Sequence, residues 1–252
     1  MTLYLAAPPE KAKAACATGF PLALMAYRPG HGFHLYRTPI PDVRPALIYV
    51  DCSDFSGFGP HRLLGGEIMG ECIARGADGI ILDILSFEEP VKSFCSCLAH
   101  ACDLNGLKLY LPYLSGNHIE GTVSIVSSDV DSGSLEAALR SVILELGHEN
   151  VALQADRAFR VYPLPCRTGV RRDVTGITPQ GLLLEKNAKS FFSKELCVNY
   201  FLYFESNRIH MALYDDKTSI TEKLRLAAAL GITEAFLCYP QAEDIAKRLR
   251  EP

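Results

Sequence analysis

The chain has 252 residues, of which 48% are hydrophobic and 21% charged, and its formal net charge at pH 7 is −4. A chain of this length buries roughly 70–75% of its unfolded surface, so it needs no metal ion or disulfide bond to be stable. The slightly acidic balance argues against nucleic acids and anionic membranes as partners, because both require a basic surface.

The nine cysteines are odd in number and show no paired spacing, which indicates reduced thiols in a cytoplasm. The segment Cys95–Asp103 contains Cys97 and His100 as conceivable metal ligands, but its cysteines have the spacing of a core-facing helix. We therefore expect no metal and no cofactor. The N-terminus lacks the features of a signal peptide, and no apolar stretch approaches the ~20 residues of a membrane span. We expect a soluble, cytoplasmic protein.

Short apolar segments alternate with helical patterns along almost the whole chain, which is typical of βα units and a parallel sheet. The predicted strands are Thr2–Ala6, Pro21–Tyr27, Ala46–Asp51, Gly79–Ile84, Leu107–Leu114, Thr122–Ser127, Val151–Ala155 and Ala235–Tyr239. Eight is the number of strands that closes a barrel, and about 250 residues is its usual length. The predicted fold class is α/β: a (β/α)8 TIM barrel that forms a single domain over residues 1–252.

The helices complete this pattern with one exception. They are predicted at Pro9–Thr18, His61–Arg75, Pro90–Leu104, Ser134–Gly147, Ser219–Leu230 and from Gln241 onwards. Ser219 and Glu222 form a predicted capping box, and Gly231 ends that helix. Only "SGNHIEG" separates the fifth and sixth strands, so the helix between them is missing or very short.

The segment from Cys166 to Asp216 interrupts the alternation. It contains a helical piece at Pro179–Lys189, followed by two strands around a turn at Ser206-Asn207, which predicts a hairpin. A stretch of this length is too long for a plain loop. We predict an α+β insertion subdomain over residues 166–216, between the seventh strand and its helix.

Candidate site residues follow from the rule that the C-terminal ends of barrel strands form the active-site mouth. The mouth is predicted to contain Asp51, Asp54, Asp83, Glu88, Tyr113, Asp129 and Tyr239. It offers carboxylates and aromatic rings but no Gly-rich phosphate loop, which favours polyols and sugars over phosphorylated substrates. The alternative is that the carboxylates cap βα turns. For Asp83, which lies inside an apolar strand, a functional and a structural role are equally supported.

Two segments resemble the chitinase-like family-18 glycoside hydrolases. "ADGIILDILSFEEP" (Ala77–Pro90) occupies the place of that family's fourth-strand signature D-G-x-D-x-D-x-E. The segment Ile209–Pro240 resembles the family's closing stretch, through Asp215, Ser219, Ile220, Lys223, Leu224 and Gly231-Ile232. The closest likeness is to the branch associated with bacterial spores and peptidoglycan. The resemblance implies a (β/α)8 barrel and a ligand that contains N-acetylglucosamine.

The departures from the family pattern bear on catalysis. The resemblance implies that Asp83 orients the acetamido group, but Ile81 replaces the middle Asp, and Leu85 replaces the Glu that donates the proton. At the sixth strand Asp129 remains while the Tyr before it does not, and Cys238 aligns with the family's Trp. Losing a general acid typically lowers the rate by about 10²–10⁴. We therefore do not expect chitinase-type hydrolysis.

Three functions remain open. The first is a family-18-like barrel without ordinary hydrolase activity, which binds a glycan or a protein partner at its mouth through Asp51, Tyr113, Asp129 and Tyr239. The second is an active N-acetylglucosaminidase-type enzyme, in which Asp83 works with a relocated acid, Glu88. The third is a scaffold in spore assembly with no glycan ligand. The sporulation link would place the protein at the spore rather than free in the cytoplasm.

Overall fold

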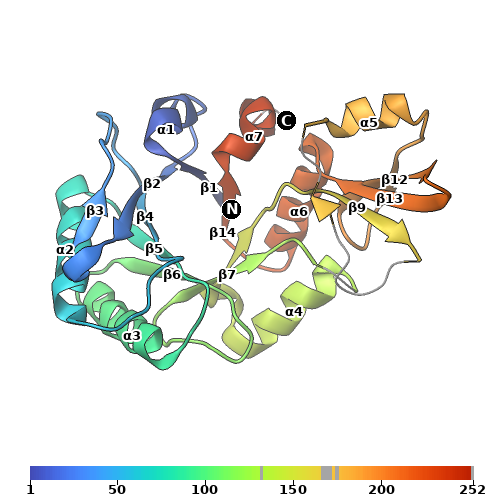
Figure 1. Ribbon diagram of the computed structural model, residues 1–252. Helices are drawn as coiled ribbons and strands as arrows, with labels where there is room; N and C mark the ends of the chain where they lie inside the picture. Colours follow the sequence, from blue (N-terminus) through green and yellow to red (C-terminus); the bar gives the residue numbers. More distant parts are fainter. Residues whose placement is uncertain (131–132, 166–171, 174–175, 251–252) are drawn as a thin grey trace.

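The computed structural model describes residues 1–130, 133–165, 172–173 and 176–250. Eight parallel strands close into a barrel (Figure 1). They are β1 (Thr2–Ala7), β2 (Leu22–Pro29), β4 (Leu47–Asp51), β5 (Gly79–Asp83), β6 (Lys108–Pro112), β7 (Val123–Ser127), β8 (Val151–Gln154) and β14 (Glu234–Cys238). The order is β1-β14-β8-β7-β6-β5-β4-β2, and the pairing of β2 with β1 completes the ring. The predicted (β/α)8 barrel is confirmed.

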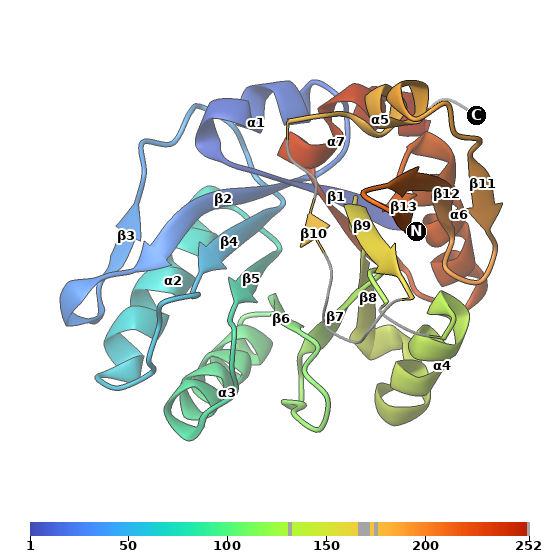
Figure 2. The same ribbon diagram turned by 45° about the vertical axis from the view of Figure 1, so that its right-hand side comes forward.

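Helices pack around the barrel after most of its strands (Figure 2). They are α1 (Pro9–Cys16), α2 (His61–Arg75), α3 (Glu89–Leu104), α4 (Leu135–Leu146), α6 (Lys217–Ala229) and α7 (Tyr239–Ala246). Residues 113–122, all of them described, connect β6 to β7 without a helix, as predicted. The connection from β2 to β4 instead contains the short strand β3 (Leu35–Arg37), which pairs antiparallel with the C-terminal end of β2. None of the described helices is both long and apolar enough to cross a bilayer.

The capping box predicted for α6, between Ser219 and Glu222, is wrong, because other residues form the cap. Asp216, not Ser219, is the N-cap: its carboxylate accepts the Ser219 N–H at 2.9 Å, and Ser219 Oγ accepts the Asp216 N–H at 2.9 Å. Asp is as good an N-cap as Ser, so the helix begins two residues earlier than expected. The Ser219 hydroxyl consequently lies inside the first turn, where it can also donate to Asp215.

A second, antiparallel sheet interrupts the barrel between β8 and α6. Its order is β10-β9-β13-β12-β11, and its elements are β9 (Phe159–Leu164), β10 (Arg172–Asp173), β11 (Phe191–Ser193), β12 (Val198–Glu205), β13 (Arg208–Tyr214) and helix α5 (Pro179–Glu185). The predicted hairpin is confirmed, with Ser206 and Asn207 at φ 49° and 61°, as a tight hairpin turn requires. Strand β9 precedes Cys166 and was not expected, and Cys166 itself lies outside the described residues.

Side chains fill the interior of the barrel between its two ends. The inward-facing cluster consists of Ala6, Ala23, Leu47, Ile81, Tyr110, Ala152 and Phe236. Towards the N-terminal ends of the strands, Glu234 accepts hydrogen bonds from Tyr110 at 3.1 Å and from Lys108 at 2.9 Å. Side chains in a strand alternate between its faces, so the residues two positions beyond this cluster point into the opposite, C-terminal mouth.

The cysteine-rich helix packs as its spacing predicted. Cys95, Leu98 and Cys102 are all buried on the core-facing side of α3. The eight cysteines within the described residues are all free thiols.

Candidate active site at the barrel mouth

A cavity of about 410 Å³ opens at the C-terminal ends of β2, β4 and β5. Met25 and Arg28 of β2, Tyr49 and Asp51 of β4 and Asp83 of β5 line it. The C-terminal ends of the strands are where enzymes with this fold place their active sites. The structure therefore brings the predicted residues Asp51 and Asp83 together in one cavity.

Tyr49 explains how a carboxylate is accommodated in the apolar strand β5. Its hydroxyl donates a hydrogen bond of 2.6 Å to Asp83 Oδ2. Burial, and then the negative charge of Asp83, raise the pKa of Tyr49 well above its usual value, so the phenol keeps its proton and remains a donor. Asp83 follows the inward-facing Ile81 by two residues, and β5 pairs with β4 in a register that sets Asp51 beside Asp83.

A second hollow of about 590 Å³ adjoins the first. Arg28, Tyr36 and Asp51 line both cavities, and the second adds Asp54 together with the ring of Phe33. The Asp51 carboxylate accepts the Ser53 N–H at 3.0 Å, which fixes the loop after β4. Carboxylates, a guanidinium group and aromatic rings in one hollow are the groups that bind sugars.

Three predicted site residues lie elsewhere among the described residues. The Tyr113 hydroxyl donates to Glu145 Oε2 of α4 at 2.8 Å. Tyr239, the first residue of α7, is 5% exposed. Glu88 is exposed at the N-cap position of α3, where its side chain makes no capping hydrogen bond. None of the three lines either mouth cavity.

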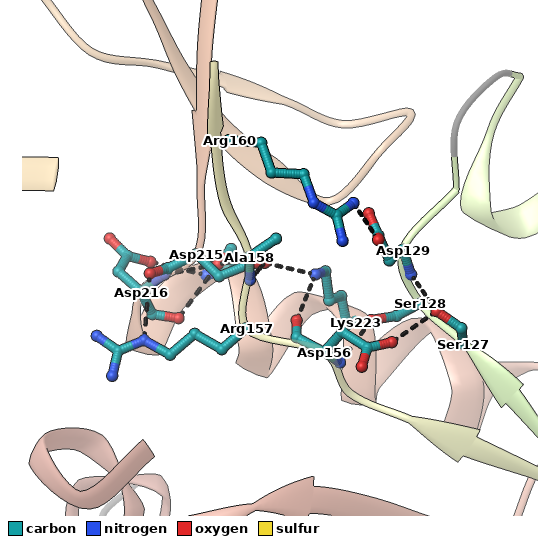
Figure 3. Close-up of polar contacts among 11 residues, drawn as sticks. Ser127, Ser128, Asp129, Asp156, Arg157, Ala158, Arg160, Asp215, Asp216 and Lys223 are labelled. Atoms are coloured by element: carbon teal, nitrogen blue, oxygen red, sulfur yellow. Dashed lines mark hydrogen bonds and ion pairs between the residues drawn. The ribbon is translucent and has the colours of Figure 1, made fainter. Parts of the chain in front are cut away.

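Asp129, at the end of β7, connects the barrel to the second sheet. Its carboxylate forms an ion pair with Arg160 of β9 (Figure 3). Its backbone N–H donates to Ser127 Oγ at 3.0 Å. The structure thus places this predicted ligand-binding residue outside the two cavities that Asp51 and Asp83 line, in contact with Arg160.

Asp156 is a mouth residue that the sequence analysis missed. It follows β8, and its Oδ2 accepts a hydrogen bond of 2.6 Å from Ser127 Oγ, while its N–H donates to Ser128 Oγ at 2.9 Å. Burial raises the pKa of the Asp156 carboxyl above its usual value. The signal was present, because Asp156 directly follows the predicted strand Val151–Ala155, the position that singled out the other candidates.

A buried ion pair supports the backbone of Asp156. Lys223 Nζ of α6 donates to Asp215 Oδ2 at 2.8 Å and to the Asp156 carbonyl at 3.0 Å. The Lys223 and Asp215 side chains are 3% and 0% exposed. Asp215 also accepts the Ser219 hydroxyl at 2.7 Å and the Ala158 N–H at 3.0 Å. These hydrogen bonds link the segments that follow β8 and β13 to helix α6 (Figure 3).

The architecture and the mouth define a (β/α)8 barrel that carries an antiparallel insertion before α6 and a polar, aromatic cavity at the ends of β2, β4 and β5. No known family profile matches the sequence, and no curated protein matches it. Solved structures do match it.

The barrel resembles those of chitinases and of a spore cortex-lytic enzyme. Chitinase from Chromobacterium violaceum superposes with a TM-score of 0.71 at 14% identity, over 98% of this chain and 97% of that one. The spore cortex-lytic enzyme SleL of Bacillus cereus gives 0.71 at 13% identity, over 98% and 73%. A GH18 chitinase from Cycas revoluta, in complex with (GlcNAc)3, gives 0.66 at 14% identity, over 98% and 97%. The chain therefore has the fold of the family-18 chitinases, as its resemblance to them predicted.

Proposed function

We propose that this protein is a family-18-like barrel that binds an N-acetylglucosamine-containing glycan at its mouth and does not run the chitinase reaction. The hydrogen bond of 2.6 Å between Tyr49 and Asp83 carries the proposal. It holds a carboxylate in the wall of an open cavity that aromatic and charged groups also line. Such a carboxylate can accept hydrogen bonds from an acetamido N–H or from sugar hydroxyls.

The similar fold supports the choice of ligand. A chitinase with the same barrel was solved with (GlcNAc)3. In the family signature, the position of Asp83 is that of the carboxylate that orients the acetamido group. A glycan bound against Asp83 would extend along Arg28 and Tyr36 into the adjoining hollow.

Leu85 is the reason to propose loss of the chitinase reaction. It stands two residues after Asp83, where the signature has its proton-donating Glu, and its side chain is 71% exposed. Leucine has no proton to donate. Glu88 is the alternative acid expected from the sequence. It is exposed and lines neither cavity, so we assign it no role as a proton donor. Location in the cytoplasm or at the spore stays a prediction.

The test is a calorimetric titration of chitooligosaccharides into the wild type, Asp83→Asn and a matched control, Asp103→Asn. Asp103 is exposed on α3, away from the mouth. Hydrogen bonds to a charged group are worth about 1.5–3 kcal/mol, so Asp83→Asn should weaken binding by roughly ten- to a hundredfold while Asp103→Asn leaves it unchanged. A wild type that binds no glycan, or equal affinities for all three proteins, would refute the proposal.

A further inference from the structure

Helix α5 covers one face of the second sheet, and the opposite face is apolar as well. On the covered face, Leu182 of α5 packs against Val161, Phe201 and Ala212 of the sheet. Side chains alternate along a strand, so the neighbours of these residues point to the opposite face. An antiparallel sheet with one packed face usually presents polar side chains on the other. The second sheet departs from this pattern.

The strand register makes the opposite face a continuous patch of nine side chains in three rows. Each row takes one residue from β9, one from β13 and one from β12: Leu164, Ile209 and Phe204; Tyr162, Met211 and Leu202; Arg160, Leu213 and Tyr200. Cβ atoms of residues that lie opposite on adjacent strands are about 4.5–5.5 Å apart, so the patch is contiguous. We call these nine residues the apolar face, because eight of them are apolar or aromatic.

The two rows nearer the hairpin turn are the most exposed part of the apolar face. Phe204 is 67% exposed, and Leu202 and Ile209 are 47% and 48% exposed, whereas Phe201 on the covered face is fully buried. Phe191 of β11, whose ring lies 5.6 Å from that of Tyr200, extends the exposed surface. Single exposed apolar residues are ordinary, but a contiguous exposed patch marks an interaction surface.

Area favours a second copy of this chain as the partner. The apolar face and Phe191 together leave on the order of 600 Å² exposed, so two copies packed face to face would bury about 1,200 Å², the lower end of the range for specific interfaces. Two antiparallel sheets pack well in this way, because their side chains interdigitate in a layer about 10 Å thick.

Charge and shape favour the same partner. Arg160 carries the one charge of the apolar face and is paired with Asp129, so two identical faces meet without an unpaired like charge. A hollow of about 730 Å³ opens at the end of the face, and Leu164, Phe204 and Ile209 are among the residues that line it. The exposed ring of Phe204 is thus next to a hollow that the same ring of a second copy would fill.

We propose that the protein forms a two-fold symmetric dimer, in which the apolar faces of two copies pack against each other. Each residue of a two-fold interface is buried once in each copy, so every apolar side chain of the face contributes twice. Helix α5 stays on the outside of the dimer. The mouth cavities at β2, β4 and β5 share no residue with the apolar face, so the dimer does not depend on the proposed glycan binding.

Sedimentation velocity of the full chain between about 1 and 200 µM tests the dimer. The wild type should pass from monomer to dimer with a dissociation constant in the micromolar range, as an interface of this size gives. Phe204→Asp would bury two carboxylates in the dimer and should raise the dissociation constant at least a hundredfold. The matched control is Leu184→Asp, at an 83% exposed position on α5, which should leave it unchanged.

Amide chemical shifts of the wild type locate the interface without relying on a variant. Dilution should shift amides of β12 and β13 between Tyr200 and Leu213, and should leave those of Tyr49 and Asp83 unchanged. A wild type that stays monomeric at 200 µM, a Phe204→Asp variant that dimerises like the wild type, or dilution shifts confined to other elements would each overturn the inference. Shifts of the apolar face caused by chitotriose and not by dilution would show that a glycan covers it, and would overturn the inference as well.

Discussion

The two sides of the barrel mouth differ in how their polar groups are used. On the side of β2, β4 and β5, Asp51, Asp83 and Arg28 line open cavities, and Asp83 accepts a hydrogen bond from the neutral hydroxyl of Tyr49. On the side of β7 and β8, charged groups are paired with one another and tie the second sheet to the barrel. Side chains of the same chemical kinds therefore line open cavities on one side and hold elements together on the other.

Exposure and partners decide between these roles. Asp83 keeps one oxygen engaged by a neutral donor and faces an open cavity, so its charge remains available. Asp215 is fully buried and accepts hydrogen bonds from Lys223, Ser219 and Ala158, so its carboxylate interacts only with groups of the fold itself. Asp156 combines both situations, because Lys223 binds its backbone carbonyl and its carboxyl accepts the Ser127 hydroxyl at the end of β7.

The largest expected effect is a loss of stability on the side of β7 and β8. Lys223→Met leaves the Asp215 charge buried without its cation, which should lower the free energy of unfolding by about 3–5 kcal/mol. Urea denaturation measures it. The matched control is Lys11→Met, which removes the exposed Lys11–Glu243 pair and should change stability far less. Similar losses in both variants would contradict the division of the mouth into two sides.

The next largest effect is a gain of hydrolytic activity on the side of β2, β4 and β5. Leu85→Glu returns a carboxyl to the position that the signature gives to the proton donor, and it should raise cleavage of chitohexaose about 10²-fold. Leu85→Gln has the same shape without the acid and should show no gain. If neither variant exceeds the wild type, position 85 is not where the acid of this barrel would act.

A smaller effect is expected in the pH dependence of stability, when the wild type is compared with Asp156→Asn. An acid whose pKa is raised by folding stabilises the fold below its unfolded pKa, about 3.9 for Asp, and that stabilisation is lost as the pH rises through the folded pKa. Asp156→Asn lacks this loss, so it should gain stability relative to the wild type as the pH rises from about 4. Urea midpoints measured between pH 3.5 and 8 test this. A constant difference would show that the pKa of Asp156 is not raised.

The smallest effect concerns the corrected helix cap. Asp216→Ala removes the N-cap of α6 and should cost roughly 1 kcal/mol, measured by thermal unfolding. Glu222→Ala tests the cap that the sequence suggested, and its cost should be smaller, because the partner of Glu222 is the exposed Arg225. A larger loss of stability in Glu222→Ala than in Asp216→Ala would support the predicted capping box instead.

The barrel could be predicted from the sequence because its signals are local. Apolar runs bounded by turn residues locate the eight strands to within a few residues, and helix α2 has the predicted ends, His61 and Arg75. The cap at Asp216 was missed because Asp and Ser are both good N-caps, and the two lie three residues apart.

The site depends on contacts that no local pattern encodes. The hydrogen bond from Tyr49 to Asp83 joins residues on neighbouring strands and requires the register of β4 against β5. The ion pair of Asp129 with Arg160 requires the second sheet to lie over the end of β7, and strand β9, which carries Arg160, was itself unexpected. Asp156 could have been found by applying the strand-end rule to every predicted strand.

The most direct test of the central claim is to map where the glycan contacts the protein, by amide chemical-shift changes in ¹H–¹⁵N spectra during titration with chitotriose. The account predicts that the largest changes occur in Arg28, Tyr49, Asp51 and Asp83, on the open side. Changes confined to the second sheet, or the absence of any change at millimolar chitotriose, would contradict it.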